Sequence, residues 1–495
     1  MTATAGAPST KSILWKTIIW STVQYEVERL QLRIAKAINT GRYHKVKALQ
    51  WLLTHSFSAK LLAIKRATEN AGKKTPGIDG VVWKTDKQKI NAAYTLKRVG
   101  YKAQPLRRIY IPKKNGKLRP LGIPTMTDRA QQALHLLGLL PIAEIQADEN
   151  SYGFRPKRST HDAIAQCFNL LSRRWSPQWV LEGDIKACFD RISHDWVLKH
   201  VMMDKAVLQQ WLKAGYIEKD VLNATTEGTP QGGIASPTLA NIVLDGLEKT
   251  ILDAVKKGEK VHFVRYADDF ICTAESKETL ETKVLPVIID FLKERGLELS
   301  LEKTKITHIN EGFDFLGFNI RKYEEKLLIK PSASSGKKFS DSIRENIKAL
   351  GNTASVKLIA SLNSKIRGWT NYYRGCVAKA IFNDIDKVVF DTLWRMLKRK
   401  HKDKNISWIR RKYFTTIGSR TWCFFCKVNG SKGKKLYTMV KAADTVIKRH
   451  IKIIGKATPY NEDYKDYFIE REDRLKRERI NSRTVQRTVL KGLEP

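Results

Sequence analysis

The sequence has no run of about 18 apolar residues, the length that a membrane-spanning helix needs. Its longest nearly apolar piece, Leu134–Ala143, has the length of a buried helix. The six cysteines among 495 residues are scattered, which favours a reducing compartment without disulfides. No repeat at solenoid periods and no long low-complexity tract is present. These absences argue against a membrane-spanning protein, a disulfide-stabilised secreted domain and a repeat array.

Acidic residues are few beside basic ones: 50 Asp and Glu against 90 Lys and Arg give a formal charge of +40. Such an excess favours a polyanionic partner, because each cation placed on a phosphate releases a condensed counterion. An anionic membrane surface is the alternative, and charge and motifs together favour nucleic acid. The first residues lack the apolar core of a secretory signal. This start is rich in Ser, Thr and Ala, as an organelle address would be, but its lack of arginine disfavours that alternative. We expect a bacterial cytoplasmic protein that is nucleoid-associated when on DNA.

The chain is long enough for about three domains. Residues 15–71 have helical periodicity, and Pro105–Pro124 predicts a hairpin around an Asn-Gly turn. Strands and helices mix as far as Phe318, and helical periodicity returns beyond the Ser- and Gly-rich segment Pro331–Ser342. From Met396 to Lys456 there are 18 Lys and Arg residues against two acids, interleaved with aromatics. This mixture favours a nucleic-acid-binding module over a merely solvated face.

Two adjacent carboxylates, Asp268 and Asp269, lie between the strand-like segments HFVRY and FICTA. Alternation along a straight strand would point them to opposite faces, so we expect them at the turn between the two strands. Like charges ~4 Å apart repel by roughly 4 kcal/mol at an effective dielectric of about 20. A bound divalent cation would offset that repulsion, whereas a solvent-exposed Asp-Asp turn is the alternative.

A third carboxylate comes from the segment WVLEGDI, which predicts a buried strand ending in Asp184. Asp190 and Asp195 fall on the helical or turn side, where capping or pairing with basic residues is expected. One carboxylate at a strand end, facing a carboxylate pair on a hairpin, is typical of two-metal phosphoryl transfer. No His or Cys cluster with soft-ligand spacing competes, so the sequence predicts Mg²⁺ as cofactor.

Eight segments in order resemble the reverse transcriptases encoded within group II introns: KKTPGIDG, IYIPKKNGKLRPLGIPTMTDRAQQ, SYGFRPKRSTHDA, DIKACFDRISH, GTPQGGIASPTLANIVL, RYADDF, GLELSLEKTKI and FDFLGF. The resemblance covers nearly the whole chain. It implies an α+β fold: a right-hand polymerase with fingers and an antiparallel, ferredoxin-like palm sheet, an α-helical thumb or maturase domain, and a small basic C-terminal DNA-binding domain. The domains expected are an N-terminal helical extension (1–75), fingers and palm (76–335), thumb or maturase domain X (336–420) and the DNA-binding domain (421–495).

The resemblance also implies roles for individual residues. Phe189 is expected beneath the sugar of the nucleotide, where its ring would exclude a 2′-hydroxyl, although an ordinary core position is the alternative. Lys113 and Arg119 flank the hairpin turn and would grip the triphosphate, and Lys117 could share that role. The implied set is: catalytic, Asp184, Asp268 and Asp269; metal-binding, Asp184, Ile185, Asp268 and Asp269; nucleotide-binding, Lys113, Arg119, Phe189, Gln231 and Lys303; template and primer, Gly232, Gly233, Leu316 and Gly317; RNA-binding, Arg367, Trp369, Tyr372, Tyr373, Arg374, Arg410, Arg411 and Lys412.

Several of these roles have structural alternatives. A plain turn and cap would explain TPQGG, a solvated lysine would explain Lys303, and a buried strand would explain FLGF. Trp369, Tyr372 and Tyr373 have helical spacings that also suit a helix-bundle core. The CFFC segment, Cys423–Cys426, is more typical of a buried strand than of a zinc site. With no second such motif before Pro495, we expect no HNH endonuclease in this chain and a DNA primer from elsewhere.

We therefore expect an RNA-directed DNA polymerase and intron maturase that assists splicing of its group II intron and copies the inserted intron. The expected partners are intron RNA, target DNA, an RNA template with a DNA primer, and deoxynucleoside triphosphates. A retron, diversity-generating or CRISPR-associated reverse transcriptase is one alternative, and a splicing-only RNA-binding factor is another. A viral-type RNA-dependent RNA polymerase would share the carboxylates, but Phe189 should reject ribonucleotides.

Overall fold

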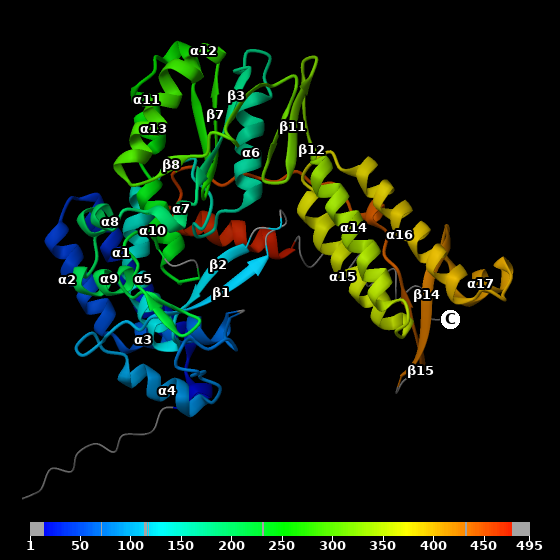
Figure 1. The fold of residues 1–495 in the computed structure, drawn as a ribbon, viewed down its shortest axis with the longest axis horizontal. Helices are drawn as coiled ribbons and strands as arrows, with labels where there is room; N and C mark the ends of the chain where they lie inside the picture. The colour runs from blue at the N-terminus through cyan, green and yellow to red at the C-terminus, as the bar shows by residue number, and fades with distance from the viewer. Residues whose placement is uncertain are drawn as a thin grey trace, which may run out of the picture.

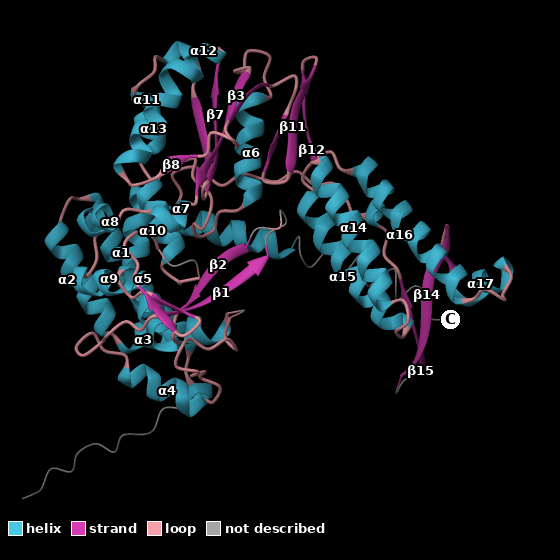
Figure 2. Cartoon of the chain, viewed as in Figure 1, coloured by secondary structure: helices cyan, strands magenta, loops and turns pink. Residues whose placement is uncertain are grey.

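The computed structural model describes residues 14–70, 72–112, 116, 118–229, 232–430 and 433–477. Figure 1 shows the N-terminal helices at one end, a β-sheet with its covering helices above them, and a helical arm to one side. Figure 2 shows that helices dominate and that the strands form separate small sheets. None of the described helices is long and apolar enough to cross a bilayer.

The N-terminal region is helical, as its periodicity predicts. The helices are α1 (Trp20–Asn39), α2 (Tyr43–His55), α3 (Phe57–Glu69) and α4 (Asp86–Thr95), after a short 3₁₀ turn at Trp15–Thr17. The helices α1, α2 and α3 pack on α5 (Met126–Gln146), which contains the segment predicted to be a buried helix, and α4 packs on α3. Residues of α5 and of the N-terminal helices share one apolar core. The N-terminal helices are therefore integral to the body of the molecule.

The predicted hairpin is present. Its strands β1 (Leu106–Pro112) and β2 (Leu118–Ile123) are antiparallel, and the order β2-β1-β4-β5 completes the sheet with β4 (Tyr216–Glu218) and β5 (Val221–Asn223). Both β4 and β5 are short and follow the helices α8 (His194–His200) and α9 (Lys205–Leu212).

The central sheet is antiparallel throughout its named strands and has the order β6-β7-β3-β8, with β9 also pairing with β3. Its strands are β6 (His262–Tyr266), β7 (Asp269–Ala274), β3 (Trp179–Lys186), β8 (Glu298–Leu299) and β9 (Lys305–His308). Alternation sends Val180 to a core with α6 (Thr160–Leu171) and Leu181 to a second core on the opposite face. The second face of the sheet is covered by α10 (Ser236–Leu244), α11 (Leu247–Asp253) and α13 (Leu285–Glu294). The remaining short elements of this region are α7 (Cys188–Arg191), a 3₁₀ turn at Lys257–Glu259, α12 (Lys277–Thr279) and a π-helical turn at Leu280–Val284.

A third sheet leads into the helical arm. It contains β10 (Phe313–Phe315), β11 (Phe318–Tyr323) and β12 (Lys326–Pro331), and the arm contains α14 (Ala333–Leu350), α15 (Ser355–Tyr373), α16 (Lys379–Lys400) and α17 (Ile406–Tyr413). Ser332 caps α14 by accepting a hydrogen bond from the Ser335 amide. Most of the Ser- and Gly-rich segment that we interpreted as preceding the helices thus lies inside α14.

The region after the arm begins with a small sheet of β13 (Phe414–Ile417), β14 (Arg420–Gly430) and β15 (Gly433–Thr438). Cys423 and Cys426 lie in β14, as predicted for a strand, and Cys423 is buried. Residues 439–477, which we call the C-terminal strap, return from the arm toward the central sheet (Figure 1). They include 3₁₀ turns at Ala442–Asp444 and Glu462–Tyr464 and end in a helix over 465–477. Strap residues Ile453, Ala457 and Phe468 share a core with α6 and the arm, instead of forming a core of their own.

Candidate active site

The three predicted carboxylates gather at one end of strands β3 and β7. Asp184 and Asp269 are directly opposed residues of this antiparallel pair, so their side chains leave the same face. Asp268 precedes β7 in the two-residue turn after β6. We expected both carboxylates of the pair in the turn, and Asp269 instead occupies the first position of the strand. The cross-strand register, more than a relaxed turn, brings Asp269 to Asp184.

The turn itself is unusual. Ala267 has a φ of 59°, in the left-handed region that non-glycine residues seldom adopt. The backbone of Gly153 lies so close that a Cβ there would be 2.2 Å from the Ala267 amide nitrogen. Only glycine fits such an approach. The turn that carries Asp268 is therefore held against a neighbouring segment.

The electrostatics reflect uncompensated negative charge. Desolvation, with the charges of Asp268 and Asp184, raises the pKa of Asp269 to about 6. Desolvation and the charge of Asp184 also raise the pKa of Asp268, while the positive charges of Arg119 and Lys303 oppose this. Lys303 Nζ donates to Asp184 Oδ2 at 2.5 Å, and this hydrogen bond raises the pKa of Lys303. The three carboxylates thus carry more negative charge than Arg119 and Lys303 offset.

These groups suit a hard divalent cation, because carboxylate oxygens are the ligands that Mg²⁺ prefers and the raised acid pKa values mark charge that a cation would stabilise. Within the described ranges, no three Asp, Glu, His or Cys side chains are arranged to enclose an ion. The Lys303 ammonium contacts Asp184 Oδ2, so a cation at that oxygen would compete with it. Ile185 follows Asp184 in β3, and its side chain is buried in the core.

Phe189 lies in α7, just after the left-handed residue Ala187. Its ring is partly buried, packs against the core and meets Phe154 edge-on with centroids 6.3 Å apart. The Phe189 carbonyl accepts a hydrogen bond from the Thr229 amide at 2.6 Å. Part of the ring surface remains accessible, so the position suits both alternatives: a ring beneath the nucleotide sugar and an ordinary core residue. Asp190 and Asp195 fall in the first turns of α7 and α8, on the helical side as expected.

The glycine segment before α10 packs against the rest of the chain. Gly232 has a φ of 119°, and a Cβ there would be 2.7 Å from the carbonyl oxygen of Gly122 in β2. A Cβ at Gly233 would be 2.7 Å from Ser236 Oγ. The positive φ and the approach to backbone require glycine at position 232, whereas the neighbours of Gly233 are side-chain atoms of Ser236 and Gln132. Of the predicted nucleotide-binding residues, Lys113 and Gln231 lie outside the described residues, as does Lys117.

The segment FLGF forms the tight turn between β10 and β11. Leu316 has a φ of 52° and Gly317 one of 82°, which is the pairing of a type I′ hairpin turn. The hydroxyls of Tyr372 and Tyr373 donate to the Leu316 and Gly317 carbonyls at 3.0 and 3.1 Å. The arm helix α15 therefore holds this turn in place.

The predicted RNA-binding residues divide into two groups. The rings on α15 belong to the arm's core: Trp369 stacks on Phe339 with centroids 4.7 Å apart, and Tyr373 is buried. Arg367 is half-buried on α15, and the Arg374 carbonyl accepts a hydrogen bond from the Lys448 amide of the strap.

The second group lies on α17, whose basic residues are exposed. The Arg410 guanidinium lies 4.8 Å from the Trp422 ring centroid, and Lys412 Nζ lies 4.4 Å from that of Trp408. Arg411 is also exposed. Cations resting on aromatic rings at a surface suit contact with a nucleic-acid backbone and bases.

The residues that support the turn carrying Asp268 were not predicted from the sequence. Arg265 and Asn241 are both buried near it, and Gly153 abuts it. The available signal was a charged residue, Arg265, in an otherwise apolar strand pattern, where a buried position requires specific partners.

Three family models match successive parts of the chain. Residues 111–320 match reverse transcriptase (RNA-dependent DNA polymerase), and residues 15–96 match the N-terminal domain of reverse transcriptase. Residues 336–414 match the group II intron, maturase-specific domain. With its α+β architecture, the matched polymerase region defines an RNA-directed DNA polymerase.

Two relatives are similar to this chain over more than half of its length. Protein YkfC of Escherichia coli (strain K12) is 32% identical over 340 residues, covering 59% of this chain and 88% of that protein. Group II intron-encoded protein LtrA of Lactococcus lactis subsp. cremoris is 30% identical over 482 residues, covering 76% of this chain and 78% of LtrA. The chain therefore belongs to the group II intron-encoded reverse transcriptases with a maturase domain, which confirms the resemblance. It is a reverse transcriptase and an intron maturase.

Proposed function

We propose that DNA synthesis takes place at Asp184, Asp268 and Asp269, with Mg²⁺ as the divalent cation. The observation that supports this most directly is the register of β3 and β7, which opposes Asp184 to Asp269 beside the Asp268 turn. The chemistry that bound Mg²⁺ supplies is activation of the primer 3′-hydroxyl and neutralisation of triphosphate charge. The proposed ligands are the carboxylates of Asp184, Asp268 and Asp269 and the main-chain carbonyl of Ile185.

The chain's own residues position the reactants in this proposal. Arg119, with Lys113 or Lys117, grips the triphosphate, and Gln231 contacts the incoming pair. Lys303, which is paired with Asp184 in the structure, would face the pyrophosphate leaving group as a cation or proton donor. Phe189 excludes ribonucleotides by occupying the space of a 2′-hydroxyl. Gly232 and Gly233 lie under the template, and Leu316 and Gly317 hold the primer end.

We assign the parts of a right hand accordingly. The hairpin β1–β2 and the N-terminal helices belong to the fingers side, the sheet β6-β7-β3-β8 is the palm, and the helices α14–α16 are the thumb. We retain 1–75, 76–335, 336–420 and 421–495 as functional divisions. The strap shares a core with α6 and the arm, so it packs with the proposed palm and thumb. Its basic side chains are the proposed contacts to DNA.

The arm and the sheet beyond it are the proposed intron-binding region. Exposed Arg410, Arg411 and Lys412 on α17 would clamp the backbone of the group II intron that encodes the protein, stabilise its folded shape and so assist splicing. Arg367, on α15, and Arg374, just after it, are proposed as further RNA contacts, whereas Trp369, Tyr372 and Tyr373 pack in the arm's core. The spliced intron would insert into target DNA and be copied from a DNA primer during retrohoming.

The test is the double variant Asp268→Asn, Asp269→Asn, assayed by primer extension on an RNA template with Mg²⁺ and by intron splicing from the same preparation. We expect DNA synthesis to fall by at least about a thousandfold, because the metal ligands are lost. Intron binding and splicing assistance should remain, since these residues lie on the palm sheet and not on the arm. Full DNA synthesis by a folded double variant would refute the proposed site.

A further inference from the structure

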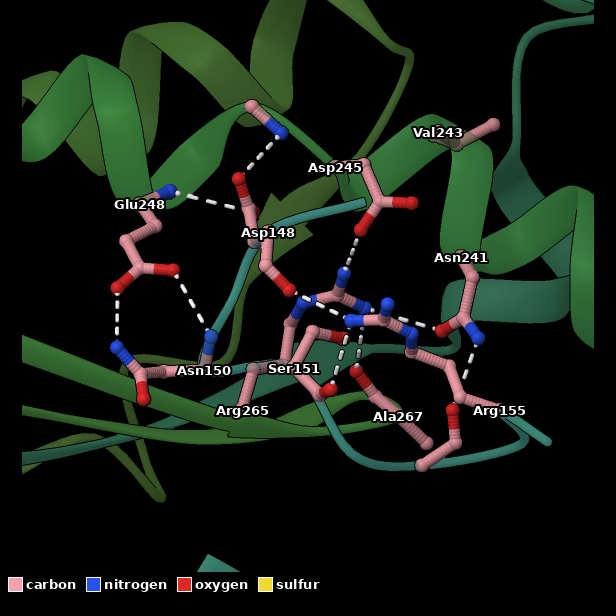
Figure 3. Close-up of polar contacts among 12 residues, drawn as sticks. Asp148, Asn150, Ser151, Arg155, Asn241, Val243, Asp245, Glu248, Arg265 and Ala267 are labelled. Atoms are coloured by element: carbon pink, nitrogen blue, oxygen red, sulfur yellow. Dashed lines mark hydrogen bonds and ion pairs between the residues drawn. The ribbon is translucent and has the colours of Figure 1, made fainter. Parts of the chain in front are cut away.

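Arg265, on β6, is fully buried beside the catalytic turn. Figure 3 shows its guanidinium pointing at three acceptors, two at α10 and one in the turn. One nitrogen forms an ion pair with Asp245, which follows α10, and the other donates to Asn241 Oδ1 at 3.1 Å and to the Ala267 carbonyl at 3.3 Å. One planar group therefore joins α10 to the residue immediately before Asp268.

The same turn is fixed from its other side by Gly153. Asn241 Nδ2 donates to the Gly153 carbonyl at 2.8 Å, while its Oδ1 accepts from Arg265. Asn241 thus links the two groups that contact the Ala267 backbone. Because Ala267 has a left-handed φ of 59°, several contacts from neighbouring residues must hold the turn in this strained conformation. Arg265, Asn241 and Gly153 supply those contacts.

Stability alone does not account for this arrangement. Replacing a buried ion pair with apolar residues of similar volume is often neutral or stabilising, because both charges must be desolvated. Arg265 Nε is moreover buried without a hydrogen-bond partner among the described residues. What the guanidinium supplies, and an apolar side chain would not, is a donor aimed at the Ala267 carbonyl.

We propose that Arg265 is a positioning residue for DNA synthesis: by holding the Ala267 carbonyl between Asp245 and Asn241, it fixes the direction in which Asp268 and Asp269 present their carboxylates to the metal ions. The residue touches neither substrate nor metal and acts only through the turn. A lysine could keep the charge beside Asp245 but has no second, diverging nitrogen on a rigid plane to serve Asn241 and Ala267 as well.

This inference rests on the proposed catalytic site. The test therefore compares Arg265→Lys with the Asp268→Asn, Asp269→Asn double variant in the full chain. In Arg265→Lys we expect kcat for primer extension to fall by about ten- to a hundredfold, because small displacements of catalytic groups are costly, with the KM for deoxynucleotide changed less than threefold. Mn²⁺ binding, followed by electron paramagnetic resonance without substrates, should weaken by about fivefold or more. Intron affinity should be unchanged.

The matched control is Arg471→Lys, which alters another buried Arg–Asp pair, with Asp162, away from the turn. It should lower thermal stability without changing Mn²⁺ affinity. Asn241→Ala is a second variant, at an uncharged residue, in case Arg265→Lys is unstable. It should reproduce the selective losses of kcat and Mn²⁺ affinity.

The inference is overturned if Arg265→Lys and Asn241→Ala both keep wild-type kcat and Mn²⁺ affinity. It is also overturned if the losses in these two variants only parallel a loss of folded protein, as in Arg471→Lys. If the aspartate double variant itself retains DNA synthesis, the proposed catalytic site fails. If that variant is inactive while both turn variants behave as wild type, only the role of Arg265 fails.

Discussion

Asp184 and Asp269 stand directly opposite one another on β3 and β7, and Lys303 Nζ lies 2.5 Å from Asp184 Oδ2. Lys303 and Arg119 do not balance three carboxylates, and Asp269 has a pKa raised to about 6. A protein without bound cation therefore carries a repulsion that the chain itself does not relieve. This cost has a measurable pH dependence.

Asp269→Asn should raise the thermal stability of the metal-free protein, and the gain should depend on pH. The pKa of Asp269 is higher in the folded chain than the ordinary value of about 3.9, so the folded state binds the proton more tightly and wild-type stability falls as pH rises from about 4 to about 6. The gain from asparagine should be smallest near pH 4 and level off above about pH 6. Thermal melts across this range, in chelator, measure it.

Asp253→Asn, at an exposed position at the end of α11, is the matched control and should show no such trend. At pH 7.5, added Mg²⁺ should stabilise wild type more than Asp269→Asn, because the cation binds the folded site. A gain that is equal at pH 4 and pH 8 would contradict the electrostatic account.

Phe189→Ala should relax sugar discrimination. If the ring occupies the space of a 2′-hydroxyl, its removal should raise the relative kcat/KM for ribonucleotides by about ten- to a hundredfold. Steady-state incorporation of matched ribo- and deoxynucleotides measures this. Phe168→Ala, at a partly exposed position of α6, should leave discrimination unchanged. Reduced stability with unchanged discrimination in Phe189→Ala would assign the ring to the core beside Phe154.

The central sheet was predictable because its determinants are local. The apolar alternation of WVLEGDI and HFVRY and the turn position of Asp268 come from a few adjacent residues, and β3, β6 and β7 follow them closely, although Asp269 begins β7 instead of lying in the turn. The exact register of Asp184 against Asp269 was not predictable. It depends on two strands separated by more than 80 residues, and a one-residue slip would have sent the carboxylates to opposite faces.

Tyr373→Phe should loosen the turn at Leu316 and Gly317. The Tyr373 hydroxyl donates to the Gly317 carbonyl at 3.1 Å and lies 2.6 Å from Ser335 Oγ, so its loss should cost about 1–2 kcal/mol of unfolding free energy. If this turn holds the primer end, the KM for primer should rise several-fold while the ring keeps its packing. Tyr25→Phe, on an exposed tyrosine of α1, is the control. Unchanged primer KM with the expected destabilisation would limit Tyr373 to a structural role.

Asp162→Asn should release the C-terminal strap. The buried Asp162 Oδ1 accepts from His450 Nε2, the Ile453 amide and Arg471, each at 2.8 Å. Burial opposes ionisation, but the His450 hydrogen bond and those from Ser159 and Ile453 lower the pKa of Asp162 to about 2. The anchoring should therefore be complete above about pH 4 and be lost as pH falls toward 2.

In Asp162→Asn at pH 7, the loss of one partner of a buried ion pair should cost about 3–5 kcal/mol. Amide hydrogen exchange over residues 448–477 should accelerate by an order of magnitude or more, with little change in α13. Asp463→Asn, at an exposed strap position, is the control. Equal acceleration throughout the chain would indicate global unfolding instead of strap release.

The strap illustrates what the sequence does not reveal. The basic run Met396–Lys456, which extends into the strap, predicted a surface that binds polyanions, yet the strap is anchored through Asp162, which lies 288 residues from His450 and 309 from Arg471. The rings of Trp369 and Tyr373 had helical spacing that suited either core or surface, and only the packing of Phe339 and the FLGF turn against them selects the core. Contacts between distant segments, and not local periodicity, decide such cases.

Neutralising α17 should change how intron binding responds to salt. Each Lys or Arg placed on a phosphate contributes close to one unit to the slope of log affinity against log salt concentration. Arg410→Ala, Arg411→Ala and Lys412→Ala together should therefore weaken binding at low salt and reduce the slope by about 2–3. A triple variant of exposed lysines elsewhere, Lys249→Ala, Lys257→Ala and Lys293→Ala, lowers net charge equally and should change the slope by less than one. Filter-binding titrations from 50 to about 500 mM salt distinguish the two; equal slopes in both variants would indicate that α17 contributes only to the general field of the protein.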